Sequence, residues 1–514
     1  MDKQKVVKII SNNWIQFLLF SGLLWLIFVH LHINRYIDDI ITGPHYWRKS
    51  DTYAQIMNYY YNGLNFFDHS LYFNQMTTNG KAVAEFPLIY WLIALQMKIF
   101  GPSTMLIKIN YIVLMFIGLF SLFKIAYYFT KNYVFSLGLG VILFLSPVFT
   151  SYSIAYLPDP LAFYLILIGL WCLIKYNTKQ KYLIVAIVLI SVAGMIKPFF
   201  LIPYLALLCT MILNKLWLKN KSIKFNWLFL IPLLMVGLWF LYTNWYNAQV
   251  KSDYFLSKAR PIWNYDDNAI HKTWTRIINR WLAEYLNPKL LWILLSLIIT
   301  NIVWWQKKYI LHQLFYIFSV LGSFIFVILF YNMFEHHDYY IFPILFLLPL
   351  TIGFFIFKLI NFINQKIVLN ALGFIMLVFV FFGLNYTFSV LESRRKTPLI
   401  NSKYMFKNYM NKEYFLIKNK VKPNDLIIAF SDKSPSFALT LLKRKGWSGY
   451  QTQLHKNSNT IQTLIDKGAS VLVINKNAQQ NKTDSLIIDP FLNYPIDNIN
   501  NIYLYNLKPY LNNE

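Results

Sequence analysis

Long apolar runs separated by short polar stretches occupy the first three quarters of the chain. Most of these runs approach or exceed the roughly 20 residues that a helix needs to cross a bilayer. We therefore expect about 11 membrane-spanning helices. They fall in residues 14–33, 105–129, 133–150, 161–174, 182–213 (two helices), 227–245, 290–305, 310–331, 339–357 and 367–386.

The run at residues 182–213 contains a charged interruption. As a single helix it is roughly 48 Å long, too long for one crossing. Lys197 precedes Pro198 inside it. We expect a break at this pair, which separates an outward helix from an inward one.

Lysine positions predict the topology. Lys3, Lys5 and Lys8 precede the first run, so the N-terminus is expected in the cytoplasm. That run is long and lacks a small-residue cleavage site, which favours a retained anchor over a signal peptide. Residues 85–100 are apolar but short, and we interpret them as an amphipathic helix in the membrane interface. Each proposed cytoplasmic loop then carries lysine, and residues 34–84 lie outside.

The chain changes character near residue 387 and becomes polar. The stretches DLIIAF and SVLVI indicate strands, and PSFALTLLKRK and TIQTLIDKG indicate helices, which together favour a small α/β domain. We expect residues 1–386 to form a transmembrane catalytic domain and residues 387–514 an extracytoplasmic α/β domain. Neither G-x-G-x-x-G nor a P-loop occurs, so a nucleotide site is not expected.

Composition supports a polytopic α-helical membrane protein. The chain is 57% hydrophobic and 14% charged, with a mean hydropathy of +0.42, far from a soluble average. Its net charge of +26 would indicate nucleic acid in a soluble protein. Here the lysines cluster in short loops as topology signals, so nucleic acid is not an expected partner. Cys172 and Cys209 lie in apolar runs and give no information on disulfides or compartment.

Three acids are candidates for chemistry on the outer face. Asp51 lies in RKSDTYA, Glu85 in AEFPLIYW and Asp159 in YLPDPLA, each where the chain passes from water into apolar surroundings. A charge at bilayer depth costs roughly 2.5–3.5 kcal/mol on insertion scales, so it usually has a partner or a task.

Each acid also has a purely structural interpretation. Asp159 is placed to cap the helix that follows it, and Glu85 is placed to be a first-turn acid that the helix dipole favours. Asp51 has cations nearby in the sequence, Arg48 and Lys49, with which it could pair structurally.

Lys197 is the notable cation. A compact ammonium at the outer membrane surface suits a lipid phosphate, although a snorkelling lysine is the simpler alternative. Glu335, His336 and His337, in FEHHDYYIFP, could bind a divalent metal ion together with Glu85, because carboxylate and imidazole ligands suit several such ions. No ligand spacing supports this strongly. Tyr340 of the same stretch also fits an interfacial aromatic belt.

Other catalytic arrangements are missing from the sequence. The hydrolase motif G-x-S-x-G does not occur, and neither a cysteine nor a serine stands in a nucleophile motif. Carboxylates with cations at an outer membrane surface remain, and they fit general-base chemistry on a phosphate-linked substrate.

The series of motifs resembles a known family. HYWRKSDTYAQIMNYYYNGLNF, EFPLIYWLIALQMKIFG, YLPDPLAF and HHDYYIFP follow one another in the order typical of bacterial GT-C glycosyltransferases of the family 39 type. These are relatives of the protein O-mannosyltransferases and of aminoarabinose transferases. The resemblance covers residues 8–386. It implies a GT-C fold with juxtamembrane helices in the first outer loop, in a bacterial inner (plasma) membrane.

The resemblance also implies an activity. Such enzymes move a sugar from a polyprenyl-phosphate carrier, with inversion, to a lipid, polysaccharide or protein acceptor. Membrane lipids surround the site, and a divalent metal ion is an optional cofactor. By position, Asp51 and Asp159 match catalytic acids, Asp51 as the general base and Asp159 in shaping the acceptor or sugar site. The matching substrate-binding residues are Arg48, Glu85, Lys197, His337 and Tyr340, and Glu85 and His336 are the candidate metal ligands.

The chain departs from the family pattern at two positions. Thr52 follows Asp51 where many relatives have a second acid, and Phe86 follows Glu85 where many have a basic residue. Two other functions stay open. A transporter or flippase of lipid-linked sugars is one, although polar residues gather on one face only, which favours an enzyme. A scaffold whose outer domain does the work is the other.

Overall fold

The computed structural model describes residues 12–36, 44–76, 78–176, 179–218, 226–255, 258–363, 366–396, 409, 412–450, 454–455, 457–476 and 482–511. The chain divides into two compact units. The first comprises Met1–Asp38, Ile107–Phe240 and Lys258–Arg394, and the second comprises Asp39–Leu106, Leu241–Ser257 and Arg395–Glu514. The predicted boundary between residues 386 and 387 stays a prediction.

The first unit is helical. Its elements, including three helices shared with the second unit, are α2 (Asn13–His30), α5 (Thr104–Thr130), α6 (Tyr133–Val141), α7 (Pro147–Tyr152), α8 (Pro158–Tyr176), α9 (Lys181–Ile196), α10 (Ile202–Leu213), α11 (Ile231–Gln249), α12 (Asp267–Arg276), α13 (Leu282–Tyr285), α14 (Pro288–Val303), α15 (Ile310–Leu329), α16 (Leu347–Ile363) and α17 (Lys366–Lys396). Short 3₁₀ or π turns extend or join them, at η1 (Ile33–Tyr36), η2 (Ile142–Leu145), η3 (Pro198–Leu201), η4 (Asn214–Leu218), η5 (Trp227–Leu230), η6 (Ile262–Asn264), η7 (Ile277–Trp281), η8 (Lys307–Tyr309), η9 (Tyr331–Glu335) and η10 (Asp338–Ile344).

The expectation of a polytopic helical membrane protein is confirmed. The described residues contain eight helices long and apolar enough to cross a membrane, or nine if the bent pair Asp267–Tyr285 and Pro288–Val303 forms one span. Two shorter apolar helices, Tyr133–Leu145 and Lys181–Ile196, coincide with the two remaining predicted spans. The segment predicted to lie in the interface contains the short helix α4, Leu88–Phe100.

Prolines decide where these helices break. α9 ends at Ile196, Lys197 is extended with φ −152° and ψ 116°, and Pro198 opens η3, because a residue before proline avoids helical geometry. The break predicted at this pair is therefore present. The predicted span 133–150 is interrupted as well: the Ser146 hydroxyl accepts from the Phe149 N–H and Pro147 begins α7, a cap followed by a first-turn proline.

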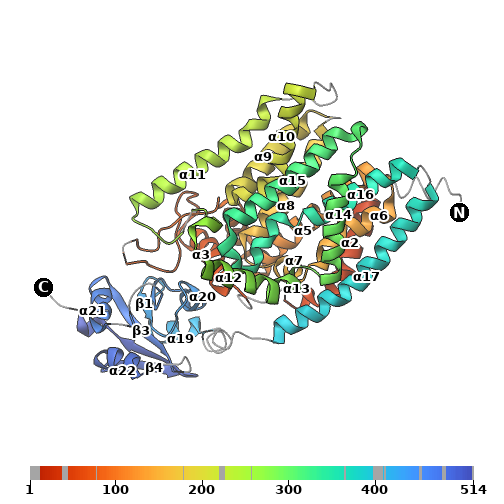
Figure 1. Cartoon of the computed structure of the whole chain (residues 1–514). Coiled ribbons are helices and arrows are strands. Elements are labelled where there is room, and N and C mark those ends of the chain that lie inside the picture. Colours follow the sequence, from red (N-terminus) through yellow and green to blue (C-terminus); the bar gives the residue numbers. More distant parts are fainter. Residues whose placement is uncertain are drawn as a thin grey trace. The chain divides into compact units, whose positions relative to one another are not determined.

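Packing within the first unit is tight between neighbouring helices. α8 lies against α9, and α10 lies against α15 (Figure 1). Gly169 of α8 permits the first contact, because a Cβ at this position would lie 2.6 Å from Cγ1 of Ile190. A close helix approach at a small residue is the usual packing device inside membranes.

The second unit contains the C-terminal sheet, and the predicted small α/β domain is confirmed. Its strands are β1 (Leu426–Ala429), β2 (Gly446–Ser448), β3 (Ala469–Asn475), β4 (Pro495–Ile499) and β5 (Ile502–Asn506). The order in the sheet is β2-β1-β3-β5-β4; β1 is parallel to β2 and β3, and β5 is antiparallel to β3 and β4. The helical elements of the unit are α3 (Tyr46–Tyr61), α4, α19 (Glu413–Lys418), α20 (Phe437–Leu442), α21 (Ser458–Asp466), α22 (Lys482–Ile488), η11 (Asp489–Phe491) and η12 (Lys508–Tyr510).

The loop that follows the first span joins this sheet at its β2 edge. Phe73 forms a parallel bridge with Gly446. The Gly446 N–H donates to the Tyr72 carbonyl at 3.0 Å, and the Asn74 N–H donates to the Gly446 carbonyl at 2.7 Å. Met76 packs against the core beneath the sheet. Segments from both ends of the sequence therefore build one unit.

Candidate functional site

Helix α3 carries the first candidate base. Asp51 lies in its second turn and is 3% exposed. Arg48 precedes it by three residues, which places both side chains on one face of the helix. Their closest charged atoms, Nη1 of Arg48 and Oδ2 of Asp51, are 3.9 Å apart, which is an ion pair without a hydrogen bond.

Two hydroxyl groups hold the Asp51 carboxylate. Tyr254 donates to Oδ2 at 2.9 Å and also lies 3.1 Å from Oδ1. Ser436 donates to Oδ1 at 2.9 Å. Both donors belong to the second unit but come from other segments of it, the stretch after α11 and the turn before α20.

The surroundings tune the acidity of Asp51. Burial raises the pKa of its carboxyl from 3.8 to about 6, against the opposing effects of Arg48, Ser436 and Tyr254. Burial and the nearby carboxylate raise the pKa of Tyr254 well above its usual range, so the phenol keeps its proton and acts as the donor. At neutral pH Asp51 is therefore ionised but basic enough to take a proton.

Arg48 connects Asp51 with Glu85. Its Nη2 forms an ion pair with the Glu85 carboxylate, and its guanidinium lies 5.5 Å from the ring centre of Phe255. Its Nη1 is buried and has no hydrogen-bond partner among the described residues. Buried donors are nearly always paired, so this nitrogen is available to an anionic oxygen beside Asp51. We call Asp51, Arg48, Glu85, Tyr254 and Ser436 the Asp51 site.

A second charged pair lies in the first unit. Asp159, in the first turn of α8, is 1% exposed and accepts from the Lys197 ammonium at 3.0 and 2.9 Å. The ammonium also lies 5.4–5.5 Å from the ring centres of Phe199, Tyr339 and Tyr340, a cation–π arrangement. Lys197 is thus held between a carboxylate and three rings at the break between α9 and η3.

The histidine stretch supplies fewer contacts. The His337 ring lies 5.4 Å from that of Tyr339 and 5.7 Å from that of Tyr340, so both predicted substrate-binding residues of this stretch adjoin the Lys197 rings. His336 is largely exposed, with Nε2 3.4 Å from Glu335. Among the described residues, no group of three or more His, Cys, Asp or Glu side chains could hold a metal ion.

The candidate metal ligands also have other neighbours. Glu85 pairs with Arg48 in the second unit, whereas His336 belongs to the first unit. The metal site that these two ligands predict stays a prediction.

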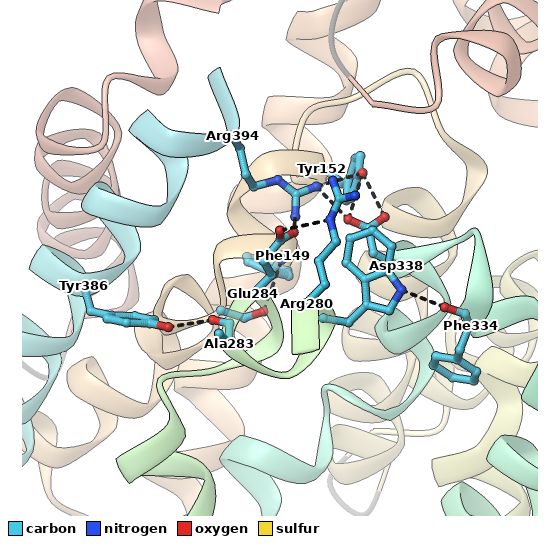
Figure 2. Close-up of polar contacts among 11 residues, drawn as sticks. Phe149, Tyr152, Arg280, Ala283, Glu284, Phe334, Asp338, Tyr386 and Arg394 are labelled. Atoms are coloured by element: carbon cyan, nitrogen blue, oxygen red, sulfur yellow. Dashed lines mark hydrogen bonds and ion pairs between the residues drawn. The ribbon is translucent and has the colours of Figure 1, made fainter. Parts of the chain in front are cut away.

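A buried charge network in the first unit was not predicted. Figure 2 shows Arg394, near the end of α17, between two carboxylates. Its guanidinium forms ion pairs with Glu284 of α13 and with Asp338 of η10, the latter at 2.6 Å. Tyr152 of α7 donates to Asp338 at 2.9 Å and accepts from Arg394 at 3.0 Å (Figure 2). The network ties α17 to three other elements.

The structure brings the predicted residues together in two groups. Asp51, Arg48 and Glu85 meet in the second unit, and Lys197 meets Asp159 and Tyr340 in the first. Tyr254 and Ser436 were missed, because a tyrosine in a polar loop and a serine before a short helix carry no distinguishing pattern. Arg394 and Asp338 were missed for a similar reason, since a pairing 56 residues apart in sequence leaves no local spacing.

Comparison with known proteins places the fold. Residues 84–245 match the family model described as dolichyl-phosphate-mannose-protein mannosyltransferase. No curated protein sequence matches the chain. The matched residues include Glu85, Asp159 and Lys197 but end before the Tyr254 segment.

Solved structures with a similar fold extend the likeness to nearly the whole chain. ArnT from Cupriavidus metallidurans in the apo state has a TM-score of 0.61 at 11% identity and covers 97% of this chain and 99% of its own. ArnT bound to undecaprenyl phosphate has a TM-score of 0.59 at 11% identity, covering 98% and 100%. The Archaeoglobus fulgidus oligosaccharyltransferase tethered to an acceptor peptide has a TM-score of 0.50 at 9% identity, covering 92% and 72%. The chain therefore has the fold of the GT-C glycosyltransferases of the protein mannosyltransferase and ArnT type, as its motif series predicts.

Proposed function

We propose that the protein is an inverting glycosyltransferase. It moves a sugar from a polyprenyl-phosphate carrier to a lipid, polysaccharide or protein acceptor on the outer face of the membrane. The observation that carries this proposal is the Asp51 site: a buried carboxylate with a pKa near 6 lies beside a guanidinium nitrogen that has no hydrogen-bond partner among the described residues. A base and an anion-binding group side by side suit attack on a phosphate-linked sugar.

Asp51 acts as the general base. It takes the proton of the acceptor hydroxyl while the acceptor oxygen bonds to C1 of the sugar from the face opposite the phosphate. The bond between C1 and the phosphate oxygen breaks, and its electron pair leaves with the carrier phosphate. The configuration at C1 inverts. No acid has to protonate the leaving group, because the phosphate already accommodates negative charge.

Arg48 of the second unit and Lys197 of the first unit are each proposed as a phosphate ligand. The buried Nη1 of Arg48 offers a charge-assisted hydrogen bond, which is stronger than a neutral one. Lys197 is held as a point charge by Asp159 and three rings, and a phosphate becomes its second anionic partner. The Tyr340 ring lies beside the same cation, and the His337 ring packs against Tyr340. Asp159 keeps the Lys197 ammonium in place.

Solved relatives of similar fold support the substrate class. One was crystallised with undecaprenyl phosphate, and another was tethered to an acceptor peptide. The apolar helices and the lysine-bearing loops support a multi-pass protein of the bacterial inner membrane, with its N-terminus in the cytoplasm and its C-terminal domain outside. The assay described next uses a panel of sugars and acceptors to identify both.

The test is a transfer assay with purified protein in lipid nanodiscs. The protein is incubated with a panel of polyprenyl-phosphate sugars and acceptors, and release of the free carrier phosphate and glycosylation of the acceptor are measured together. We expect both products in equal amounts. The Asp51→Asn variant should fold but lose transfer, by roughly 100-fold or more for a positioned base.

The matched control is Asp68→Asn, the same change at a partly buried carboxylate of the second unit that does not contact Asp51. It should retain transfer. Near-wild-type activity of Asp51→Asn would remove the base assignment. Movement of intact lipid-linked sugar across the bilayer, without release of carrier phosphate, would identify a flippase instead.

A further inference from the structure

The two hydroxyl donors on Asp51 have no part in the reaction as written above. Ser436 lies 385 residues after Asp51 in the sequence, and Tyr254 lies 203 residues after it. Both nevertheless converge on one buried carboxylate. Arg48 stays 3.9 Å away and makes no hydrogen bond to Asp51, so the two hydroxyls determine how this carboxylate is oriented.

The hydrogen bonds fix the orientation of the carboxylate. A carboxylate offers about four lone-pair positions on its two oxygens. Ser436 donates to Oδ1, and the single phenolic proton of Tyr254 is directed at Oδ2 at 2.9 Å, with Oδ1 at 3.1 Å. Nη1 of Arg48 is 3.9 Å from Oδ2, beyond hydrogen-bond distance. Within the described residues, each oxygen thus has one hydroxyl donor, and a further acceptor position of Oδ2 lies on the side of the guanidinium.

A rigid turn presents Ser436. The carboxylate of Asp432 accepts from the Ser434 N–H at 2.8 Å and from the Ala438 N–H at 2.7 Å, and the Ser434 hydroxyl accepts from the Phe437 N–H at 3.1 Å. Asp432 and Ser436 are fully buried. These bonds close the turn on both sides of Ser436, so its hydroxyl has little freedom to point elsewhere.

The sheet places this turn where α/β folds usually bind ligands. β1 and β3 are parallel neighbours, and the turn follows the carboxyl end of β1. β2, which follows β1 in the chain, lies on one side of the β1–β3 pair. β4 and β5, which follow β3 in the chain, lie on the other side. The strand order thus reverses between β1 and β3, and active sites lie outside the carboxyl ends of strands at such reversal points.

Resting on the function proposed above, we propose that Ser436 and Tyr254 are positioning residues that aim the Asp51 carboxylate at the acceptor hydroxyl, so that the C-terminal region completes the active site. They touch neither sugar nor phosphate. They act through Asp51, by fixing the orientation of its carboxylate beside Arg48 and by stabilising the ionised form of the base. The charged and titratable groups that face Asp51 are Arg48, Glu85, Tyr254 and Tyr450.

The experiment compares Ser436→Ala, Ser436→Cys and Tyr254→Phe with wild type in the nanodisc transfer assay. Each variant removes or weakens one donor, since a thiol is a poor one. We expect kcat to fall roughly tenfold in Ser436→Ala, with Ser436→Cys between it and wild type, while the acceptor KM changes little. The acid limb of the pH–rate profile should move to higher pH by about one unit, because the lost hydrogen bond favours the ionised base.

Thr440→Val is the matched control. Thr440 lies one turn further along α20, and its buried hydroxyl has no hydrogen-bond partner among the described residues. The variant removes a hydroxyl from the same helix without touching Asp51, and we expect wild-type kcat and an unshifted acid limb. Wild-type kcat and an unshifted limb in both Ser436→Ala and Tyr254→Phe would overturn the proposal.

A second measurement keeps the two proposals separable. Infrared difference spectroscopy, which needs no substrate, follows the carboxyl band of protonated Asp51 as the pH is changed. The band is assigned by its absence in Asp51→Asn. Its midpoint should lie near pH 6 in wild type and higher in Ser436→Ala. One outcome is that no donor in the panel supports transfer but the midpoint of the infrared titration shifts in Ser436→Ala. The transferase proposal then fails, whereas the positioning of Asp51 by Ser436 is supported. An unshifted midpoint counts against the positioning role whatever the activity.

Discussion

Asp51 sets the pH range of the proposed reaction at the residue scale. The base must be ionised, and burial raises its pKa to about 6. Below that value the ionised fraction falls tenfold per pH unit. We expect kcat/KM to be level above pH 6 and to decline with unit slope below it, measured by carrier-phosphate release across about pH 5 to 8. A profile without this limb would show that another group takes the proton.

The same shift affects stability in the opposite direction. Because the folded-state pKa exceeds the ordinary value of 3.8, the folded protein binds the Asp51 proton more readily than the unfolded chain does. The free energy of unfolding that Asp51 contributes therefore increases as the pH falls from about 6 toward 3.8. Asp51→Asn should lack that gain when thermal unfolding is followed over the same range.

Lys197 gives a second residue-scale prediction. Lys197→Met should weaken binding of a polyprenyl phosphate by roughly tenfold to 100-fold, because a hydrogen bond to a charged group is lost. It also removes the cation that pairs with the buried Asp159 carboxylate, which destabilises the fold. The double variant Asp159→Asn, Lys197→Met removes both charges and restores stability without restoring binding. Carrier affinity equal to wild type in the double variant would exclude Lys197 as a phosphate ligand.

Sequence reasoning reached some residues and not others for a physical reason. Arg48 and Asp51 are three positions apart on one helix, so their proximity follows from helical geometry alone. The Lys197–Asp159 pair spans 38 residues, and the predicted helix break and topology placed both at one membrane face. Ser436 reaches Asp51 only through the sheet and its turn, and no periodicity of the sequence contains that information.

At the scale of elements, the Arg394 network determines how α17 is anchored. The guanidinium is 9% exposed and lies between Glu284 and Asp338. Arg394→Met leaves two carboxylates without their shared cation, a loss of about 3–5 kcal/mol for a buried pair. We expect a clear drop in the midpoint of thermal unfolding in detergent, measured by tryptophan fluorescence.

Arg280 provides the control for this network. Its Nε lies 3.7 Å from the same Glu284 carboxylate, but its side chain is 54% exposed (Figure 2). Exposed ion pairs contribute at most about 1 kcal/mol, so Arg280→Met should unfold near the wild-type midpoint. Equal effects of the two substitutions would mean that burial is not what makes the Arg394 pairs important.

Elements were predicted best where periodicity or proline dominates. DLIIAF and SVLVI appear as β1 and β3, and the break at Pro198 is present. The antiparallel strands β4 and β5 were not predicted. Their signal is a two-residue turn at Asn500 and Asn501, which have positive φ of 49° and 66°, a conformation that asparagine tolerates and that suits tight hairpins.

At the scale of the whole molecule, Gly446 joins the loop after the first span to the C-terminal sheet. Its φ is +153°, and a Cβ there would lie 1.8 Å from the Ile427 carbonyl oxygen. Gly446→Ala must therefore shift β2 and disturb its bonds to Tyr72 and Asn74. We expect faster proteolysis of residues 62–87 and reduced transfer.

Gly63→Ala separates this clash from backbone strain alone. Gly63 also has a positive φ, +95°, but a Cβ there would meet no atom within 4 Å. Gly63→Ala should therefore lower the free energy of unfolding by about 1–3 kcal/mol through local backbone strain. We expect it to retain transfer. Similar proteolysis of both variants would indicate that the loop is not held by the sheet.

The division of the second unit among three chain segments has a consequence for biosynthesis. The residue proposed as base is made early, whereas Ser436 lies 385 residues later. A ribosome-bound chain therefore inserts most of its helices before the carboxylate can receive its last hydroxyl. Under the proposed function, the active site is complete only once the C-terminal sheet has folded, so we expect a truncated or stalled product to have reduced activity.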